Sequence, residues 1–353
     1  MEAKSPQQVS ASSCRDERAV SEVLGVIMLL AMVITIMGGV WIFLNPYMSD
    51  FEDNTNWKSA TGITERIDDR IRVAGNSPNG TGFKNSISLV STSVQTMKAI
   101  EYWTVAADLT TRDVIQIRHH NDSTIEIKSY NERVAVVELQ NHESLQTIDV
   151  VDGEDEYRIQ HNLSRQKWIM VTAYDAHGNA LHRHVDIILS GLKVTTSLGL
   201  GEHQMALINN AVIERFPNEP WTISTMPSLS FNHLANGEVR LAILLTDAHA
   251  VKSFGGAGKT SIEFVSLGPL QLFSGPAYNI HFSSYNELHP VVSPQYHENW
   301  LQDYYIHRSS ATLTTYDGIA PFERASGADG FTVMTTSDVV FFEVDLQRVE
   351  VSS

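Results

Sequence analysis

The sequence VSEVLGVIMLLAMVITIMGGVWIFL, which spans residues 20–44, decides how the chain is organised. The 22 residues from Val23 to Leu44 carry no charge. At a helical rise of about 1.5 Å per residue they reach roughly 33 Å, enough to cross the hydrocarbon core of a membrane. We therefore expect a helix that lies in a membrane or packs among other apolar helices. We expect it to end at Asn45-Pro46, because proline removes a backbone donor and its ring clashes with the preceding turn.

The charges on either side of this segment predict its orientation. Three basic residues precede it and three acidic residues follow it closely: Lys4, Arg15 and Arg18, then Asp50, Glu52 and Asp53. Because basic flanks stay in the cytoplasm, we expect a cytoplasmic N-terminus and an extracellular C-terminal domain on a single membrane-spanning helix. The one cysteine, Cys14, lies ahead of the apolar segment, so the expected exterior part contains no disulfide.

The residues at the start of the apolar segment carry a resemblance to a known family. Arg18-Ala19 is followed by Val20-Ser21-Glu22-Val23-Leu24-Gly25-Val26, which resembles the class III signal peptide of archaeal type IV pilins in its haloarchaeal form. The resemblance implies that a prepilin peptidase cuts between Ala19 and Val20. It would remove a cytoplasmic leader, residues 1–19, and retain the hydrophobic helix, residues 20–45. It also implies other pilin subunits, the pilus assembly machinery and membrane lipid as partners.

Within this motif, Ser21, Glu22 and Gly25 are the candidate assembly residues. Bacterial pilins carry a glutamate at the fifth mature position, whereas Glu22 would occupy the third. A carboxylate near a helix N-terminus is also favourable through the helix dipole alone, beside a serine N-cap. An assembly role for Glu22 and a purely local helical role therefore both remain open.

A second helical pattern follows in residues 46–76. Ile63, Ile67 and Ile71 recur every four residues among charged neighbours, which predicts one apolar stripe on an otherwise solvated helix. Such a helix resembles the outer half of a pilin's N-terminal helix, although an ordinary amphipathic helix on a β domain has nearly the same sequence. The glycine- and proline-containing stretch 75–82 should end it.

Residues 77–353 have the pattern of a β-rich extracellular domain. Short runs rich in β-branched and aromatic residues recur every 8–12 residues or so, with turn residues between them, as in antiparallel β-sandwiches. We therefore predict a mainly β fold, with one domain or two sub-domains that divide near residues 191–203. One short helix is expected after Pro294, where Tyr296, Trp300 and Tyr304 recur every four residues.

Composition limits the function classes. The 353 residues include 41 acidic and 25 basic side chains, which gives a formal net charge of −16. An acidic chain of this kind does not suit a nucleic-acid partner, but it does suit a solvated outer surface.

Several motifs approach catalytic or ligand-binding patterns without completing them. The loop Gly255–Thr260 looks like a phosphate-binding loop, but Ser253 stands where its first glycine should be and a strand pattern follows. His182 and His184, with His177 nearby, could chelate a metal from one strand, but the sequence places no third ligand. We therefore predict no enzyme activity, no cofactor and no specific metal site.

Three sequons offer candidate N-glycosylation sites in predicted loops or turns on the expected outer side: Asn79, Asn121 and Asn162. Taken together, these features favour a pilin-like surface protein with a structural or adhesive role, on the cell membrane or in a pilus. The alternative is an extracellular ligand-binding or enzymatic domain on an uncleaved single-pass anchor. A concave pocket in the β domain would favour that alternative.

Overall fold

The computed structural model of the chain describes residues 13–110, 115–121, 124–129, 134–150, 156–160, 162–226, 229–233, 239–256, 258–289, 322–324, 330–333 and 339–353. These residues form two compact units, residues 1–55 and residues 56–353. The first unit contains most of helix α1 (Ser13–Gly75), and the second contains the last part of α1 and all of the strands.

In the first unit, α1 continues through Pro46, so the predicted end at Asn45-Pro46 is wrong. A proline inside a helix removes one backbone hydrogen bond, but the residues on both sides of it keep the helical conformation. The rings of Phe43 and Tyr47 lie 5.5 Å apart across this turn, a pairing that helical i, i+4 spacing permits. Prolines are more frequent in membrane helices than in soluble ones.

In the second unit, α1 is held by the isoleucine stripe that its sequence predicts. Ile63, Ile67 and Ile71 are between 0 and 4% exposed. They share a core with strand residues that include Ile87 and Phe264. The helix ends at Gly75, as predicted. A Cβ atom at Gly75 would come within 2.5 Å of the Gln347 side-chain oxygen, so a larger residue here would have to displace the Gln347 side chain.

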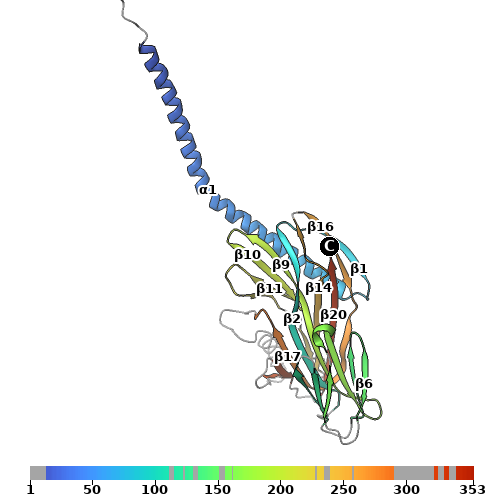
Figure 1. Ribbon diagram of the computed structural model, residues 1–353. Coiled ribbons are helices and arrows are strands. Elements are labelled where there is room, and N and C mark those ends of the chain that lie inside the picture. The colour runs from blue at the N-terminus through green and yellow to red at the C-terminus, as the bar shows by residue number, and fades with distance from the viewer. Residues whose placement is uncertain are drawn as a thin grey trace, which may run out of the picture. The chain divides into compact units, whose positions relative to one another are not determined.

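The strands of the second unit are arranged in two main layers (Figure 1). The first layer is built around β20, which pairs with β14 on one side and with β16 and β17 on the other. Its strands are β1 (Gly82–Ser88), β13 (Leu229–His233), β14 (Val239–Ala250), β16 (Lys259–Ser266), β17 (Leu270–Asn286) and β20 (Val340–Ser352). The pairing of β14 with β20 is parallel, and the other pairings of this layer are antiparallel.

The second layer is built around two long strands, β2 and β9, which pair along almost their whole length with one bulge. The second half of β17 also joins this layer, so β17 belongs to both. The layer contains β2 (Thr92–Asp108), β5 (Val136–Asn141), β6 (Leu145–Asp149), β8 (Trp168–Tyr174), β9 (Ala180–Leu198), β10 (Gly201–Ile208), β11 (Ala211–Arg215), β12 (Thr222–Thr225), β15 (Phe254–Gly256), β18 (Phe322–Arg324) and β19 (Gly330–Val333).

One of the two large cores fills the space between the two layers. It includes Trp103 and Ile187 from the second layer, and Phe342 and Val344 from the first. A separate three-stranded sheet contains β3 (Ile115–Asn121), β4 (Thr124–Ser129) and β7 (Glu156–Gln160). The four-residue helix α2 (Leu163–Gln166) precedes β8.

The predicted fold class is confirmed: the structure is mainly β, with one long apolar N-terminal helix and a large, almost wholly antiparallel sheet system. The division offered near residues 191–203 falls inside the second unit, in β9 and its hairpin with β10. The helix predicted after Pro294 lies outside the described residues.

Candidate membrane and assembly segment

The first unit presents an apolar helical surface with no protein cover. Between Val23 and Phe51 its large apolar side chains are from 43 to 75% exposed. Among the described residues, α1 is the one helix long and apolar enough to cross a membrane. Exposed apolar surface on this scale is typical of a site that lipid or another protein covers.

The few polar groups of this segment are satisfied within the helix or lie near its ends. The Thr35 hydroxyl donates to the Ala31 carbonyl oxygen at 2.7 Å, so it adds no unpaired group to an apolar environment. Trp41 and Tyr47 are exposed near the end of the uncharged run, and Asp50 and Glu52 follow. Aromatic residues at the end of an apolar run are typical of the boundary between a membrane and water.

The predicted processing and assembly residues all lie inside α1. The backbone of Arg18, Ala19 and Val20 is helical, and their side chains are outside the described residues. Ser21 and Glu22 are exposed. Because α1 begins at Ser13, Ser21 is an interior helical residue of the full chain and not its N-cap. It would become a terminal residue only if the preceding residues were removed.

Gly25 lies on the exposed apolar surface, and a side chain there would meet no atom within 4 Å. The same is true of Gly38 and Gly39. Nothing within the helix therefore requires glycine at these positions. The three glycines are available for close approach by a neighbouring helix, which small residues permit in membranes.

In the second unit, a polar clasp fixes the start of the packed part of α1. The Trp57 indole N–H donates to Glu214 Oε1 at 3.0 Å, and His203 Nε2 lies 2.7 Å from the same oxygen. The hydrogen bond with His203 lowers the pKa of the Glu214 carboxyl. Phe216 packs beside both rings, with centroids 4.8 Å from His203 and 5.9 Å from Trp57. The clasp links α1 to β10 and β11.

A second polar centre lies inside the β layers, where Glu101 is 1% exposed. Its carboxylate accepts hydrogen bonds from the side chains of Trp103, Asn209 and Asn286. Burial raises the pKa of this carboxyl, and the three donors partly oppose the effect. The donors come from three strands or turns far apart in the sequence, so no local pattern could have identified this centre.

Asn209 and Asn210 connect this centre to the neighbouring layer. They form the two-residue turn between β10 and β11, with φ values of 49° and 61°, which asparagine tolerates better than most residues. Asn209 Oδ1 accepts from the Thr246 backbone N–H, and Asn210 Oδ1 accepts from the Thr246 hydroxyl. The Asn-Asn pair is a hairpin signal that the sequence contained and that our interpretation missed.

The histidines of β9 form carboxylate pairs instead of a metal site. His182 Nδ1 lies 2.6 Å from Asp108 Oδ1, and His184 Nε2 lies 2.8 Å from Asp186 Oδ2. All four side chains are buried. Within the part of the chain that the structure describes, no group of three or more histidine, cysteine or acidic side chains is arranged to hold a metal ion.

The loop that resembles a phosphate-binding motif connects two strands. β15 ends at Gly256, and β16 begins at Lys259, so a strand follows the Lys259-Thr260 pair. The predicted strand is confirmed. The helix N-terminus that a phosphate-binding loop needs does not follow this motif.

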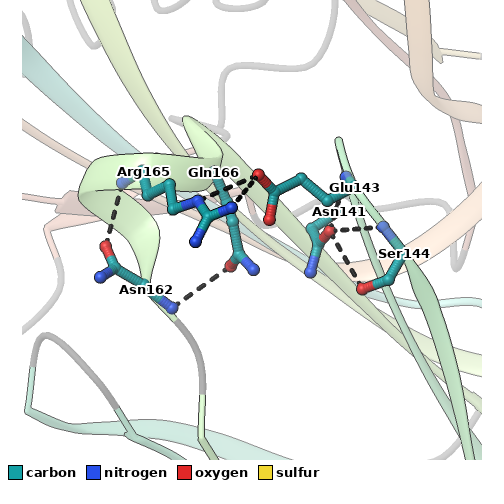
Figure 2. A network of polar contacts seen from close by, with 6 residues as sticks. All are labelled: Asn141, Glu143, Ser144, Asn162, Arg165 and Gln166. Atoms are coloured by element: carbon teal, nitrogen blue, oxygen red, sulfur yellow. Dashed lines mark hydrogen bonds and ion pairs between the residues drawn. The ribbon is translucent and has the colours of Figure 1, made fainter.

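The three candidate glycosylation sites differ in their surroundings. Asn79 is exposed in the turn between α1 and β1. Asn121 is the last residue of β3, at the hairpin with β4, and its side chain is outside the described residues. Asn162 caps α2 by accepting the Arg165 backbone N–H at 3.0 Å (Figure 2). In Figure 2, Arg165 also reaches Glu143, so this cap belongs to an exposed polar network.

No family model matches the chain, and no curated protein or solved structure matches it. Function is therefore inferred from the residues and contacts of this chain, because fold alone does not assign it.

Proposed function

We propose that the chain is a type IV pilin-like surface protein, anchored in the membrane by residues 20–45 and able to join a pilus through the same helix. Its role is structural or adhesive. The observation that carries the proposal is the continuous apolar surface of α1, preceded directly by Arg18-Ala19-Val20. A prepilin peptidase would release residues 1–19 and leave this surface at the new N-terminus.

The second unit supports the proposal through its attachment to the same helix. Ile63, Ile67 and Ile71 bury one stripe of α1 in the β unit, and Trp57 fastens it through Glu214. A force on the apolar part of the helix would thus reach a folded β unit through covalent bonds and a packed interface. That continuity suits a subunit whose helix is held while its β unit faces the outside.

The decisive experiment identifies the N-terminus of the protein from its native membranes by mass spectrometry. We expect Val20 as the first residue. We expect the variant Arg18→Glu to retain the residues ahead of Val20, because it reverses the charge next to the cut. The matched control Arg15→Glu changes a basic residue three positions away and should still yield Val20. A wild-type protein that begins at or near Met1 would overturn the proposal.

Assembly is tested separately from processing through Glu22. If Glu22 acts in assembly, Glu22→Gln should leave cleavage at Val20 unchanged while reducing the protein in sheared extracellular filaments. Glu52→Gln, a change of the same kind beyond the apolar run, is the control. Equal filament fractions in both variants would leave Glu22 only the local helical role through the helix dipole.

A second candidate function is an extracellular ligand-binding domain on an uncleaved anchor. It is favoured by one observation, a cavity in the β unit lined by Arg183, Phe273 and Phe342. The two functions differ at the N-terminus, where the second candidate predicts that the leader is retained. Ligand binding by itself is compatible with both.

A further inference from the structure

The β unit contains a partly open cavity of about 280 Å³ between its two layers. Its walls expose polar and apolar surface in similar measure and come from β9, β17, β20 and the residue after β2; the apolar side is formed by Leu109, Ala180, Phe273, Pro276 and Phe342. The cavity lies at the edge of the main core, to which Phe273 and Phe342 belong. This volume lies just below the roughly 300–1,000 Å³ of typical small-molecule sites, so the cavity suits only a very small ligand.

The cavity exists partly because residue 275 has no side chain. Gly275 lines it, and a side chain placed there would meet no atom within 4 Å. Its φ of 144° lies in the region that favours glycine. The chain therefore keeps an open space where its neighbours on β17, Phe273 and Ala277, fill the core.

Arg183 is the charged residue that lines this space. Its guanidinium is fixed by hydrogen bonds from Nε to the Thr172 hydroxyl at 3.1 Å and from Nη1 to the Leu272 carbonyl oxygen at 2.8 Å. It also lies 5.7 Å from the centre of the Phe273 ring. These contacts orient the group and leave part of its five-donor capacity unused.

The charge of Arg183 has no direct counterion in the described part of the chain. No carboxylate there forms an ion pair with it. Burial lowers the pKa of the guanidinium, and Tyr174 acts against this effect of burial on the pKa. A half-buried, oriented guanidinium beside two phenylalanine side chains, in a cavity with both polar and apolar walls, is complementary to an anion that carries an apolar group.

We propose that this cavity binds a small monocarboxylate with an apolar body, whose carboxylate pairs with Arg183 and whose body lies against Phe273 and Phe342. The carboxylate supplies the negative charge that Arg183 lacks, in the planar geometry that guanidinium prefers. The site is independent of the processing of residues 1–19. A failure here would therefore leave the proposed function unaffected.

The test uses the full chain in detergent and 4-fluorobenzoate as the probe, followed by fluorine NMR against detergent alone. A ligand of this size is expected to bind with a dissociation constant on the order of 1 mM. The neutral analogue 4-fluorobenzamide should bind about tenfold or more weakly, because it loses a charge-assisted hydrogen bond. The absence of saturable wild-type binding, or equal binding of acid and amide, would overturn the proposal.

Two variants and one control locate the site. Arg183→Gln should weaken the acid about tenfold or more, since it removes the charge but keeps a hydrogen-bonding side chain. Ala180→Phe should block the cavity while Arg183 remains. Arg215→Gln is the matched control, because Arg215 also lies over an aromatic ring, Trp221, but outside the cavity. Its binding should stay within about twofold of wild type.

Thermal unfolding of each variant distinguishes a loss of ligand binding from a loss of the folded structure. Variants that retain the wild-type unfolding temperature and lose binding support the site. If another segment of the chain already fills the cavity, the wild type will not bind the probe and Ala180→Phe will unfold at a lower temperature. That pair of results would overturn the proposal.

Discussion

The two parts of α1 contain similar apolar residues and place them in opposite surroundings. In residues 21–55 the large apolar side chains are mostly exposed, and Ile34 is 62% exposed. In the part that belongs to the β unit, Ile67 is fully buried. The difference follows from the residues that separate the apolar ones within each part of the helix. In the first part an uncharged run leaves the whole helical surface apolar, whereas in the second part charged neighbours confine the apolar residues to one stripe. The first pattern suits lipid or other helices, and the second suits a sheet.

The most direct test of this difference is to truncate one isoleucine in each part of α1. Ile67→Ala should lower the free energy of unfolding of the β unit by about 2–5 kcal/mol, because it leaves a cavity in a packed core. Ile34→Ala should change it by less than about 0.5 kcal/mol. Denaturant unfolding in detergent, followed by tryptophan fluorescence, measures both. Equal effects of the two substitutions would show that the two parts do not differ.

A charge in the first part tests what covers its apolar surface. Ile34→Arg should disfavour membrane insertion by about 2.5–3.5 kcal/mol, the cost of arginine near the centre of a membrane helix. The fraction of protein that resists alkaline extraction from membranes measures the effect. Ile34→Leu keeps the site apolar and serves as the control. Full retention of Ile34→Arg in the membrane would argue against lipid at this surface.

The clasp at the start of the packed part should make a smaller contribution. Glu214→Gln should lower the free energy of unfolding by about 1–3 kcal/mol, because it removes the charge that both Trp57 and His203 contact. The folded state lowers the pKa of Glu214, so its contribution is present above pH 4.5, the usual value for glutamate. It is lost as the pH falls through the lower folded pKa.

The exposed variant Glu219→Gln is the control for the clasp. The difference between the two variants in denaturant unfolding should be largest near neutral pH and should shrink below pH 4.5. A difference that stays constant across this range would mean that Glu214 does not act through its charge.

The smallest effect is expected on the polar side of the packed part. Burial raises the pKa of Asp68, although Arg72, at 2.8 Å, opposes this shift. The ionised carboxylate is therefore slightly unfavourable in the folded state. Above pH 3.8, the usual value for aspartate, Asp68→Asn should gain stability relative to wild type, by less than about 1 kcal/mol. The difference in thermal unfolding between pH 3 and pH 6 measures it. If the stability of Asp68→Asn relative to wild type fell as the pH rose, the assignment would be contradicted.

Local patterns predicted much of this fold from the sequence. The isoleucine stripe and the end of α1 at Gly75 both follow from residue spacing and propensity within short windows. The exception is Pro46, where one residue was given more weight than the helical residues around it.

Pairing between distant segments could not be predicted in this way. The parallel alignment of β14 with β20 joins residues about a hundred positions apart, and no local signal specifies it. Glu101 and Arg183 show the same limit, because their partners lie on strands far along the chain. The candidate processing motif was visible in the sequence because it is contiguous, whereas the cavity was not.

The position of β20 also has a consequence for biogenesis. Ile67 and Ile71, near the start of the chain, share one core with Val349 and Val351 of β20. The core around the packed part of α1 is therefore complete only after β20 has been synthesised, long after residues 20–45 have emerged from the ribosome. Under the proposed function, insertion of the apolar segment would therefore precede folding of the β unit, and the chain would cross the membrane before a folded domain could obstruct its passage.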